Sequence, residues 1–169
     1  YLEDERFFLE SSINGNVSKF ISLNEVVIHS GQLAQMFDYE LYLDDEFVYR
    51  QKADGIIFAT PTGSTAYSLS GGGPIVHPQV KSIIVTPMFP HSLSAGTLII
   101  EENCKIKIKI LSSRVKLSLD SHTSISLKKG DTVDISKHES TFNLIHPLNH
   151  NFYAGCRNKL GWSSSLISN

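Results

Sequence analysis

Alternation of apolar and polar residues is the feature that most restricts the fold of this 169-residue chain. It is clearest in Lys105–Ile110, where isoleucine and lysine take turns. Successive side chains of a β-strand point to opposite faces of a sheet, so this segment predicts a strand with a buried isoleucine face. We expect its lysines to form a solvated face that protects an open sheet edge. A phosphate-binding lysine stripe is the alternative reading.

The same alternation, or a short apolar run, recurs at intervals along the chain. Further strands are predicted at residues 7–12, 19–22, 26–28, 35–42, 46–51, 56–59, 83–85, 115–119, 125–127, 133–135 and 142–144. Asn14-Gly15-Asn16 and Asp44-Asp45 separate two pairs of these strands as hairpin turns. Strands at this regular spacing predict a mainly β fold, a two-layer, sandwich-like domain at residues 1–147. Residues 152–162 predict one longer helix within a helical tail at 148–169.

Composition and charge exclude several classes of protein. The net charge is −2 and the basic residues are scattered, so no surface for nucleic acid is predicted. No apolar run approaches the roughly 20 residues of a membrane-spanning helix, and the first residues do not resemble a secretion signal. Cys104 and Cys156 lie far apart, which predicts neither a zinc site nor a disulfide and fits a cytoplasmic protein.

The stretch at 54–78 departs from the alternating pattern. Its apolar run, Ile56–Ala59, is short enough for a buried strand, and Pro61 and Gly63 then force a tight turn. We expect Ser64 or Thr65 to cap a short helix at 66–70 that ends at the glycines 71–73. The N–H groups of a helix start, beside hydroxyls and the aromatic Tyr67, suit an anion, a ribose or a base edge. An ordinary polar connection between a strand and a helix is the alternative.

Several segments together carry a more specific pattern. Residues 60–70 read Thr-Pro-Thr-Gly-Ser-Thr-Ala-Tyr-Ser-Leu-Ser, followed by Gly-Gly-Pro and by His77-Pro78. Asn24-Glu25 within 23–27, and the segments 87–94, 143–147 and 159–162, add further matching residues. These residues closely resemble the signature of NAD kinases, over nearly all of the chain. The resemblance implies transfer of a phosphoryl group from ATP, or in some members of the family from polyphosphate, to the adenosine-ribose 2′-hydroxyl of NAD, which gives NADP.

The resemblance implies a two-domain enzyme of which this chain is the second part. NAD kinases carry a Gly-Gly-Asp-Gly motif in an N-terminal α/β domain, which supplies the base and the contacts to ATP and a divalent metal such as Mg²⁺. No Gly-Gly-Asp-Gly occurs here. We therefore expect this chain to bind NAD with no catalytic or metal-binding residue of its own, and to be inactive alone. The tail is expected to return toward the first domain, and the subunits to form a homodimer or homotetramer.

The resemblance also implies which residues contact the dinucleotide. Asn24 and Glu25 would bond the ribose and adenine edges, and Asp54 would reach a pocket of a neighbouring subunit. The full predicted set is Asn24, Glu25, Gln35, Lys52, Asp54, Thr62, Thr65, Ala66, Tyr67, Ser68, Leu69, Ser70 and His122. From the residues alone, Asn24-Glu25 also fits an ordinary turn or cap, and Lys52 and Asp54 fit a solvated surface.

Two other functions are compatible with parts of the pattern. A noncatalytic β-sandwich interaction module accounts for the strands but gives no reason for the specific turn at 60–70. The C-terminal domain of a lipid kinase related to diacylglycerol or sphingosine kinases shares the two-domain plan. Those kinases lack the complete Ser-Thr-Ala-Tyr signature with its Asn-Glu partner.

Overall fold

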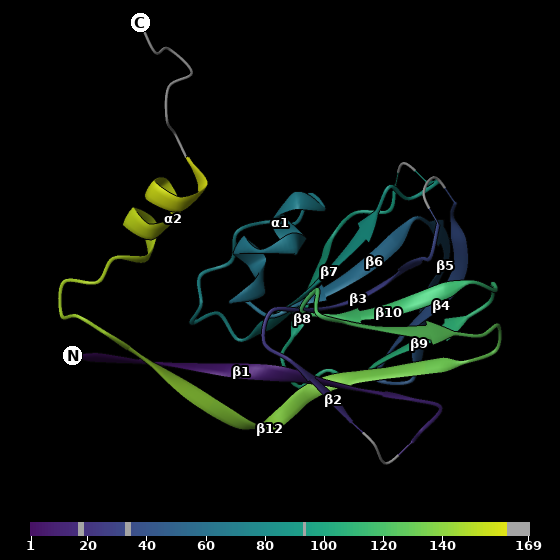
Figure 1. Cartoon of the computed structure of the whole chain (residues 1–169), viewed down its shortest axis with the longest axis horizontal. Helices are drawn as coiled ribbons and strands as arrows, with labels where there is room; N and C mark the ends of the chain where they lie inside the picture. The colour runs from purple at the N-terminus through teal and green to yellow at the C-terminus, as the bar shows by residue number, and fades with distance from the viewer. Residues whose placement is uncertain (17–18, 33–34, 93, 162–169) are drawn as a thin grey trace, which may run out of the picture.

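The computed structural model describes residues 1–16, 19–32, 35–92 and 94–161, and these form two six-stranded antiparallel sheets (Figure 1). Sheet 1 has the strand order β2-β1-β12-β9-β4-β5. Its strands are β1 (Leu2–Ile13), β2 (Phe20–Ser22), β4 (Phe37–Leu43), β5 (Glu46–Ala53), β9 (Ile106–Ile110) and β12 (Thr132–His146). The predicted hairpins β1–β2 and β4–β5 are both present.

Sheet 2 has the strand order β11-β10-β3-β6-β7-β8. Its strands are β3 (Glu25–Ser30), β6 (Gly55–Ala59), β7 (Ser82–Met88), β8 (Leu98–Glu101), β10 (Val115–Leu119) and β11 (Thr123–Leu127). The main hydrophobic core takes residues from both sheets, such as Tyr39 and Leu41 of β4 and Ile56 and Phe58 of β6. The predicted two-layer, mainly β architecture is therefore confirmed.

The alternation in Lys105–Ile110 predicts the faces of β9 correctly but its position wrongly. Ile106, Ile108 and Ile110 are buried in the main core. However, β9 pairs with β12 on one side and β4 on the other, so its lysines do not protect a sheet edge. The reason is that alternation reports which face of a strand is buried and carries no information about its neighbours.

β6 is buried on both faces, and the predicted turn that follows it belongs to the segment that covers one of them. Ile56 and Phe58 belong to the core between the sheets, whereas Ile57 and Ala59 belong to a smaller cluster with Val27, Val76 and Ile84. Such a strand needs a cover on each side, which explains its continuous apolar sequence. The cover on the outer face of sheet 2 includes the segment that follows β6, with the 3-10 helix η1 (Gly63–Thr65) and the short helix α1 (Tyr67–Ser70).

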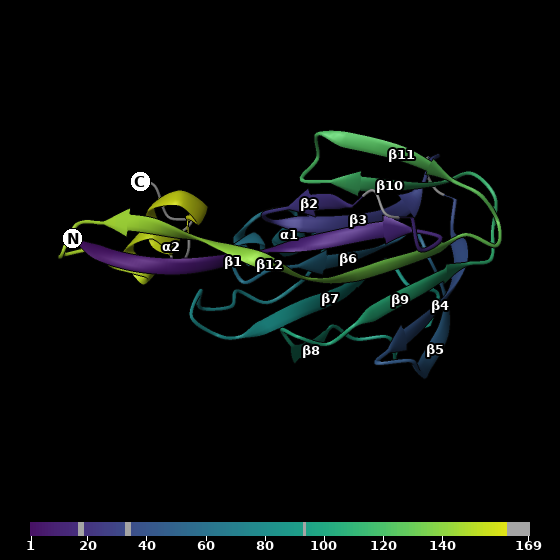
Figure 2. The same ribbon diagram turned by 90° about the horizontal axis from the view of Figure 1, so that it is seen from below.

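β1 and β12 continue beyond the sandwich as a two-stranded ribbon, with α2 (Phe152–Leu160) beside it in both views (Figures 1 and 2). Asn151 caps α2 by accepting the N–H of Ala154 at 2.9 Å, and Gly161 ends it in the left-handed conformation. Trp162, the last residue of the predicted helix, lies outside the described residues. Within the described part of the chain, no helix has the length and apolar character needed to cross a membrane.

Candidate functional site

The start of β3 and the ends of β6 and β10 are far apart in the sequence but lie side by side at one end of sheet 2. In the register of the sheet, Glu25 of β3 pairs with Ala59 of β6, and Val26 of β3 pairs with Leu119 of β10. Both neighbours are antiparallel to β3, so β3 begins where β6 and β10 end. The residues that precede β3 and those that follow β6 and β10 therefore lie together.

The hydroxyls of the turn after β6 mostly hold the turn itself. Thr60 Oγ1 donates to the carbonyl of Leu23 at 2.8 Å and accepts the N–H of Gly63 at 3.1 Å. Ser64 Oγ donates to the carbonyl of Pro61 at 2.7 Å and accepts the N–H of Val76 at 3.1 Å. The expectation that Ser64 or Thr65 caps the helix is wrong, because α1 follows Ala66 and has no side-chain cap.

Gly63 brings this turn into direct contact with the Asn-Glu pair. A Cβ atom at Gly63 would lie only 2.0 Å from the carbonyl oxygen of Asn24, an overlap that a real side chain cannot make. The N–H of Thr60 donates to the same carbonyl at 2.9 Å. Glycine is therefore required at this position for a steric reason. Because of this close contact, the Asn24-Glu25 pair and the turn after β6 form one structural unit, although they lie well apart in the sequence.

Glu25 lies beneath the turn and is only 2% exposed. Burial raises the pKa of its carboxyl, the negative charge of Asp120 raises it further, and a hydrogen bond from the backbone N–H of Tyr67 partly opposes them. The resulting pKa is about 7, compared with an ordinary value of 4.5. Its Oε2 has no hydrogen-bond partner among the described residues. A carboxyl in this state can both donate and accept hydrogen bonds near neutral pH.

A hollow of about 350 Å³ opens beside Tyr67 on the outer face of sheet 2, and we call it the Tyr67 hollow. It is within the size range of pockets that bind small molecules. Its lining residues are Val27, His29, Ser30, Gln32, Asp54, Tyr67, Met88, Ser118 and Ser121. It thus contains two predicted site residues, Asp54 and Tyr67. The Tyr67 side chain is 41% exposed and offers a flat face for stacking.

Two predicted threonines line a second hollow, on the side of the turn that faces α2. This Arg6 hollow has a volume of about 360 Å³ and contains Thr62 and Thr65. Arg6 donates to Thr62 Oγ1 at 2.8 Å and pairs with Asp4 at 2.5 Å. Burial alone would raise the pKa of Asp4, but the hydrogen bond and charge of Arg6, together with the smaller effects of His146, outweigh it and hold the pKa below its usual value.

The remaining predicted residues differ in how they are exposed. Ser68 is fully buried and its Oγ has no partner among the described residues, so its hydroxyl does not face an open surface. Ala66 and Leu69 are partly buried, whereas the exposed members are Gln35, Lys52, Ser70 and His122. The structure therefore brings together Asn24, Glu25 and the Thr60–Tyr67 turn.

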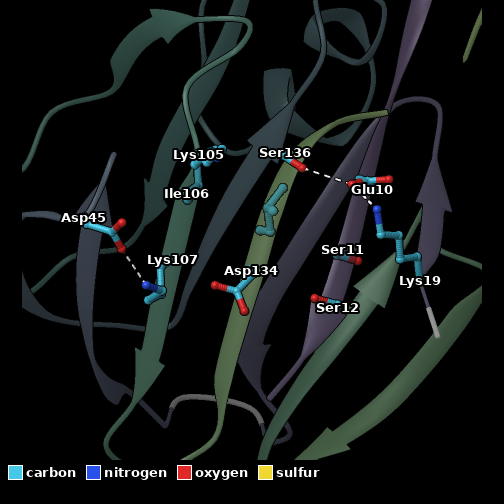
Figure 3. A pocket seen from close by; sticks show the side chains of 11 residues that line it. Glu10, Ser11, Ser12, Lys19, Asp45, Lys105, Ile106, Lys107, Asp134 and Ser136 are labelled. Atoms are coloured by element: carbon cyan, nitrogen blue, oxygen red, sulfur yellow. Dashed lines mark hydrogen bonds and ion pairs between the residues drawn. The ribbon is translucent and has the colours of Figure 1, made fainter. Parts of the chain in front are cut away.

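The outer face of sheet 1 has a separate hollow of about 260 Å³ that contains none of the predicted residues (Figure 3). Its charges are largely paired within it. Lys19 Nζ lies 2.7 Å from Glu10, and Lys107 Nζ lies 2.6 Å from Asp45. We therefore assign the candidate site to sheet 2. Across the described ranges, no three His, Cys, Asp or Glu side chains are grouped so that they would hold a metal ion.

Sequence reasoning missed three residues at this site. His29 and Ser118 line the Tyr67 hollow and bond each other, with His29 Nε2 3.0 Å from Ser118 Oγ. Asp120 accepts hydrogen bonds from the backbone that carries Asn24 and Glu25. The one available signal was the polar group at 120–122 directly after a predicted strand. Nothing in the sequence links that group to residues nearly a hundred positions earlier.

Comparisons with known proteins find similar proteins of one family. The model of the ATP-NAD kinase C-terminal domain matches residues 23–147. An NAD kinase of Teredinibacter turnerae is 45% identical over 170 residues, which covers 97% of this chain and 58% of that protein. An NAD kinase of Pseudomonas entomophila is 44% identical over 172 residues, which covers 98% of this chain and again 58% of the relative. The chain thus spans 58% of the length of these two curated relatives.

Solved structures show the same fold. A crystal structure of yeast NADH kinase complexed with NADH has a TM-score of 0.88 and 32% identity, covering 98% of this chain and 52% of that one. An NAD kinase from Archaeoglobus fulgidus in complex with ATP has a TM-score of 0.75 and 26% identity, covering 94% of this chain and 59% of that one.

Proposed function

Because the chain belongs to the NAD kinase family, through a C-terminal domain at residues 23–147, we propose that it supplies the dinucleotide-binding part of such an enzyme. The reaction is the transfer of a phosphoryl group from ATP to the adenosine-ribose 2′-hydroxyl of NAD. The bound substrate is NAD and the product is NADP. The observation that carries the proposal is the union of Asn24-Glu25 with the turn that leads to Tyr67, through the contact of Gly63 with Asn24.

Each part of this unit suits a part of adenosine. The amide of Asn24 both donates and accepts hydrogen bonds, which matches the edge of a base or a ribose hydroxyl. Glu25 is nearly as buried as Ser68, and its Oε2 has no partner among the described residues; a carboxyl that a ligand reaches at this place can bond vicinal hydroxyls. Tyr67 offers an aromatic face for stacking. Thr62, Thr65 and residues 66–70 would complete the cradle, with Gln35, Lys52 and His122 at its margin.

We propose that the chemical step requires groups outside this chain. Phosphoryl transfer depends on positioning and on neutralising charge around the phosphates, usually with a bound metal ion. The residues described here form no cluster suited to a metal, and the sequence contains no Gly-Gly-Asp-Gly. In this division, ATP, its divalent metal and the base belong to a preceding domain. Residues 1–147 form the β-rich binding and oligomerising domain, and 148–169 form the tail that returns to the preceding domain.

Exposed apolar groups on that tail agree with such a contact. Leu148 is 75% exposed and Tyr153 of α2 is 50% exposed. Ile145, near the end of β12, is exposed as well. Asp54, at the rim of the Tyr67 hollow, would reach a neighbouring subunit of a homodimer or homotetramer.

Titration of the chain with NAD by calorimetry tests the proposal. Tyr67→Ala is expected to weaken binding by roughly 1–3 kcal/mol, because it removes the stacking face. Asn24→Ala is expected to have an effect of similar size, because it leaves ligand groups without partners. Phe47→Ala is the matched control, since this aromatic is also exposed but lies at the opposite end of β5 from Asp54. Wild-type affinity in both site variants would contradict the proposal.

The two alternatives receive no specific support. An interaction module of β-sandwich type leaves the contact between Gly63 and Asn24 unexplained. The Tyr67 hollow includes His29, Asp54 and several hydroxyls, a polar lining that suits a dinucleotide better than a lipid chain.

A further inference from the structure

Asp120 holds the backbone that carries the Asn-Glu pair. Its carboxylate accepts three successive N–H groups: Leu23 N at 2.7 Å from Oδ2, and Asn24 N and Glu25 N at 2.8 and 3.0 Å from Oδ1. The N–H of Asp120 donates in return to the carbonyl of Glu25 at 3.1 Å. Four hydrogen bonds therefore join Asp120 to the segment Leu23–Glu25 at the end of sheet 2 where β3 begins.

A carboxylate is well suited to this place. Its two oxygens have about four lone-pair sites, so one side chain can satisfy three N–H groups that converge before β3 begins. Hydrogen bonds to an ionised acceptor are also stronger than those between neutral groups. Asp120 has a φ of +45° and Ser121 a φ of +59°, a left-handed turn that aspartate tolerates better than most residues. The same turn carries His122, whose N–H donates to the carbonyl of Leu119 at 3.0 Å.

The carbonyl of Asn24 is fixed from the other side by the turn after β6. It accepts the N–H of Thr60 at 2.9 Å and packs directly on Gly63. The backbone of Asn24 is thus held between Asp120 and this turn. A movement of Asp120 would change where the side chains of Asn24 and Glu25 point.

Asp120 also acts on Glu25 through its charge. Burial is the larger cause of the raised pKa of Glu25, and the coulombic effect of Asp120 is the second. The backbone N–H of Tyr67, from α1, acts in the opposite direction. Neutralising Asp120 would therefore lower the pKa of Glu25 but leave it above its ordinary value, because the burial remains.

We propose that Asp120 is a positioning residue for the dinucleotide: it fixes the backbone from Leu23 to Glu25 and thereby orients the two side chains that meet adenosine. This inference rests on the function proposed above. Asp120 itself need not touch the ligand, since its oxygens are occupied by backbone N–H groups.

The test compares Asp120→Asn with Asp131→Asn in the full chain. Asp131 is a matched control, because it too accepts a backbone N–H in a turn, from Lys128 at 2.7 Å, but at the opposite end of β11. Asp120→Asn keeps the side-chain size, loses one acceptor oxygen and brings an NH₂ group against an N–H donor. We expect NAD to bind about tenfold more weakly to Asp120→Asn and equally well to Asp131→Asn.

Two further measurements need no ligand. Amide hydrogen exchange at Leu23, Asn24 and Glu25 should become faster in Asp120→Asn, while exchange in β4 and β9 stays at the wild-type rate. The carboxyl of Glu25, followed by carbon NMR, should titrate at a lower pH than in the wild type. Asp120→Glu keeps the charge and lengthens the side chain, so it should leave the Glu25 titration raised and still weaken NAD binding.

The outcomes separate this inference from the proposed function. A wild-type chain that binds NAD, with an Asp120→Asn variant that has wild-type affinity and an unmoved Glu25 titration, overturns the role of Asp120 and leaves the proposed function standing. Unchanged amide exchange at Leu23–Glu25 overturns it as well, whatever the ligand does. A wild-type chain that does not bind NAD refutes the proposed function, and with it the role of Asp120.

Discussion

Replacing Glu25 by glutamine is expected to stabilise the folded chain above neutral pH, although Glu25 is a predicted ligand-binding residue. The buried carboxyl loses a proton near pH 7, and its charge then lies beneath the turn beside Asp120. Glutamine has nearly the same shape and carries no charge. Its amide oxygen can still accept the N–H of Tyr67, the hydrogen bond that acts on Glu25 in the native protein.

The size of the effect follows from proton linkage. The pKa is raised from 4.5 to about 7 on folding, so the native state holds the proton more tightly than the unfolded chain does. The stability due to this proton is complete below the unfolded value and is lost as the pH rises through the folded value. One pKa unit corresponds to about 1.4 kcal/mol, so the full penalty is on the order of 3 kcal/mol. About 2.5 kcal/mol of it should develop between roughly pH 5 and pH 8.

Urea unfolding of the wild type and of Glu25→Gln across this pH range measures the difference directly. Any constant cost of the substitution, such as unpaired amide hydrogens, shifts the two curves apart without changing how their separation depends on pH. Glu102→Gln is the control, because Glu102 is also buried but pairs with Lys137 at 2.9 Å. Removing that charge breaks an ion pair, so this variant should lose stability and show no gain at higher pH.

The reasoning fails if the separation between wild type and Glu25→Gln stays constant from pH 5 to pH 8. It also fails if the wild type gains stability relative to the variant as the pH rises, since that would mean that Glu25 is more stable ionised. In either case the carboxyl is better solvated, or better paired, than its surroundings in the fold indicate.

Three other substitutions test the contacts around the site by denaturant unfolding. Gly63→Ala should cost roughly 2–4 kcal/mol, because its Cβ overlaps the Asn24 carbonyl; a loss below 1 kcal/mol would mean that the two segments separate easily. Thr60→Val should cost about 1–3 kcal/mol, since it leaves the N–H of Gly63 and the carbonyl of Leu23 without their partner; an effect near zero would show that water replaces it. Arg6→Met should cost about 2–4 kcal/mol, because Asp4 loses its buried guanidinium partner and keeps His146 at 3.5 Å; wild-type stability would indicate that His146 or solvent compensates for the loss.

Much of the fold was predictable because its strands alternate or run continuously apolar. Ile106, Ile108 and Ile110 were expected on one buried face, and they are buried. The hairpin turn at Asp44-Asp45 was equally clear, and both residues have the positive φ of a tight turn. The order of strands was not predictable, because side-chain periodicity does not identify neighbours. This is why β9 was expected at an edge and lies inside sheet 1.

The candidate site, like the fold, has parts that the sequence predicts and parts that it does not. The turn at 60–70 and Asn24-Glu25 were identified from short-range sequence patterns and from resemblance. The use of the hydroxyls was misjudged, since Ser64 was expected to cap a helix and instead bonds Pro61 and Val76. A hydroxyl in a sequence pattern has several competing backbone partners, and tertiary contacts decide among them. Asp120 was missed because its partners are 95 to 97 residues away.

Antiparallel pairing explains why so few contacts are needed to assemble these distant segments. Glu25 is opposite Ala59, and Val26 is opposite Leu119. These two pairings place the segment before β3 and the segments after β6 and β10 at the same end of sheet 2. A slip of one residue in β3 would turn Val26 and Ile28 out of the main core, so burial fixes the register strongly. The core therefore fixes the position of the site to within one residue. The carboxylate of Asp120 then holds the backbone before β3, and the absence of a side chain at Gly63 lets the turn after β6 pack against Asn24.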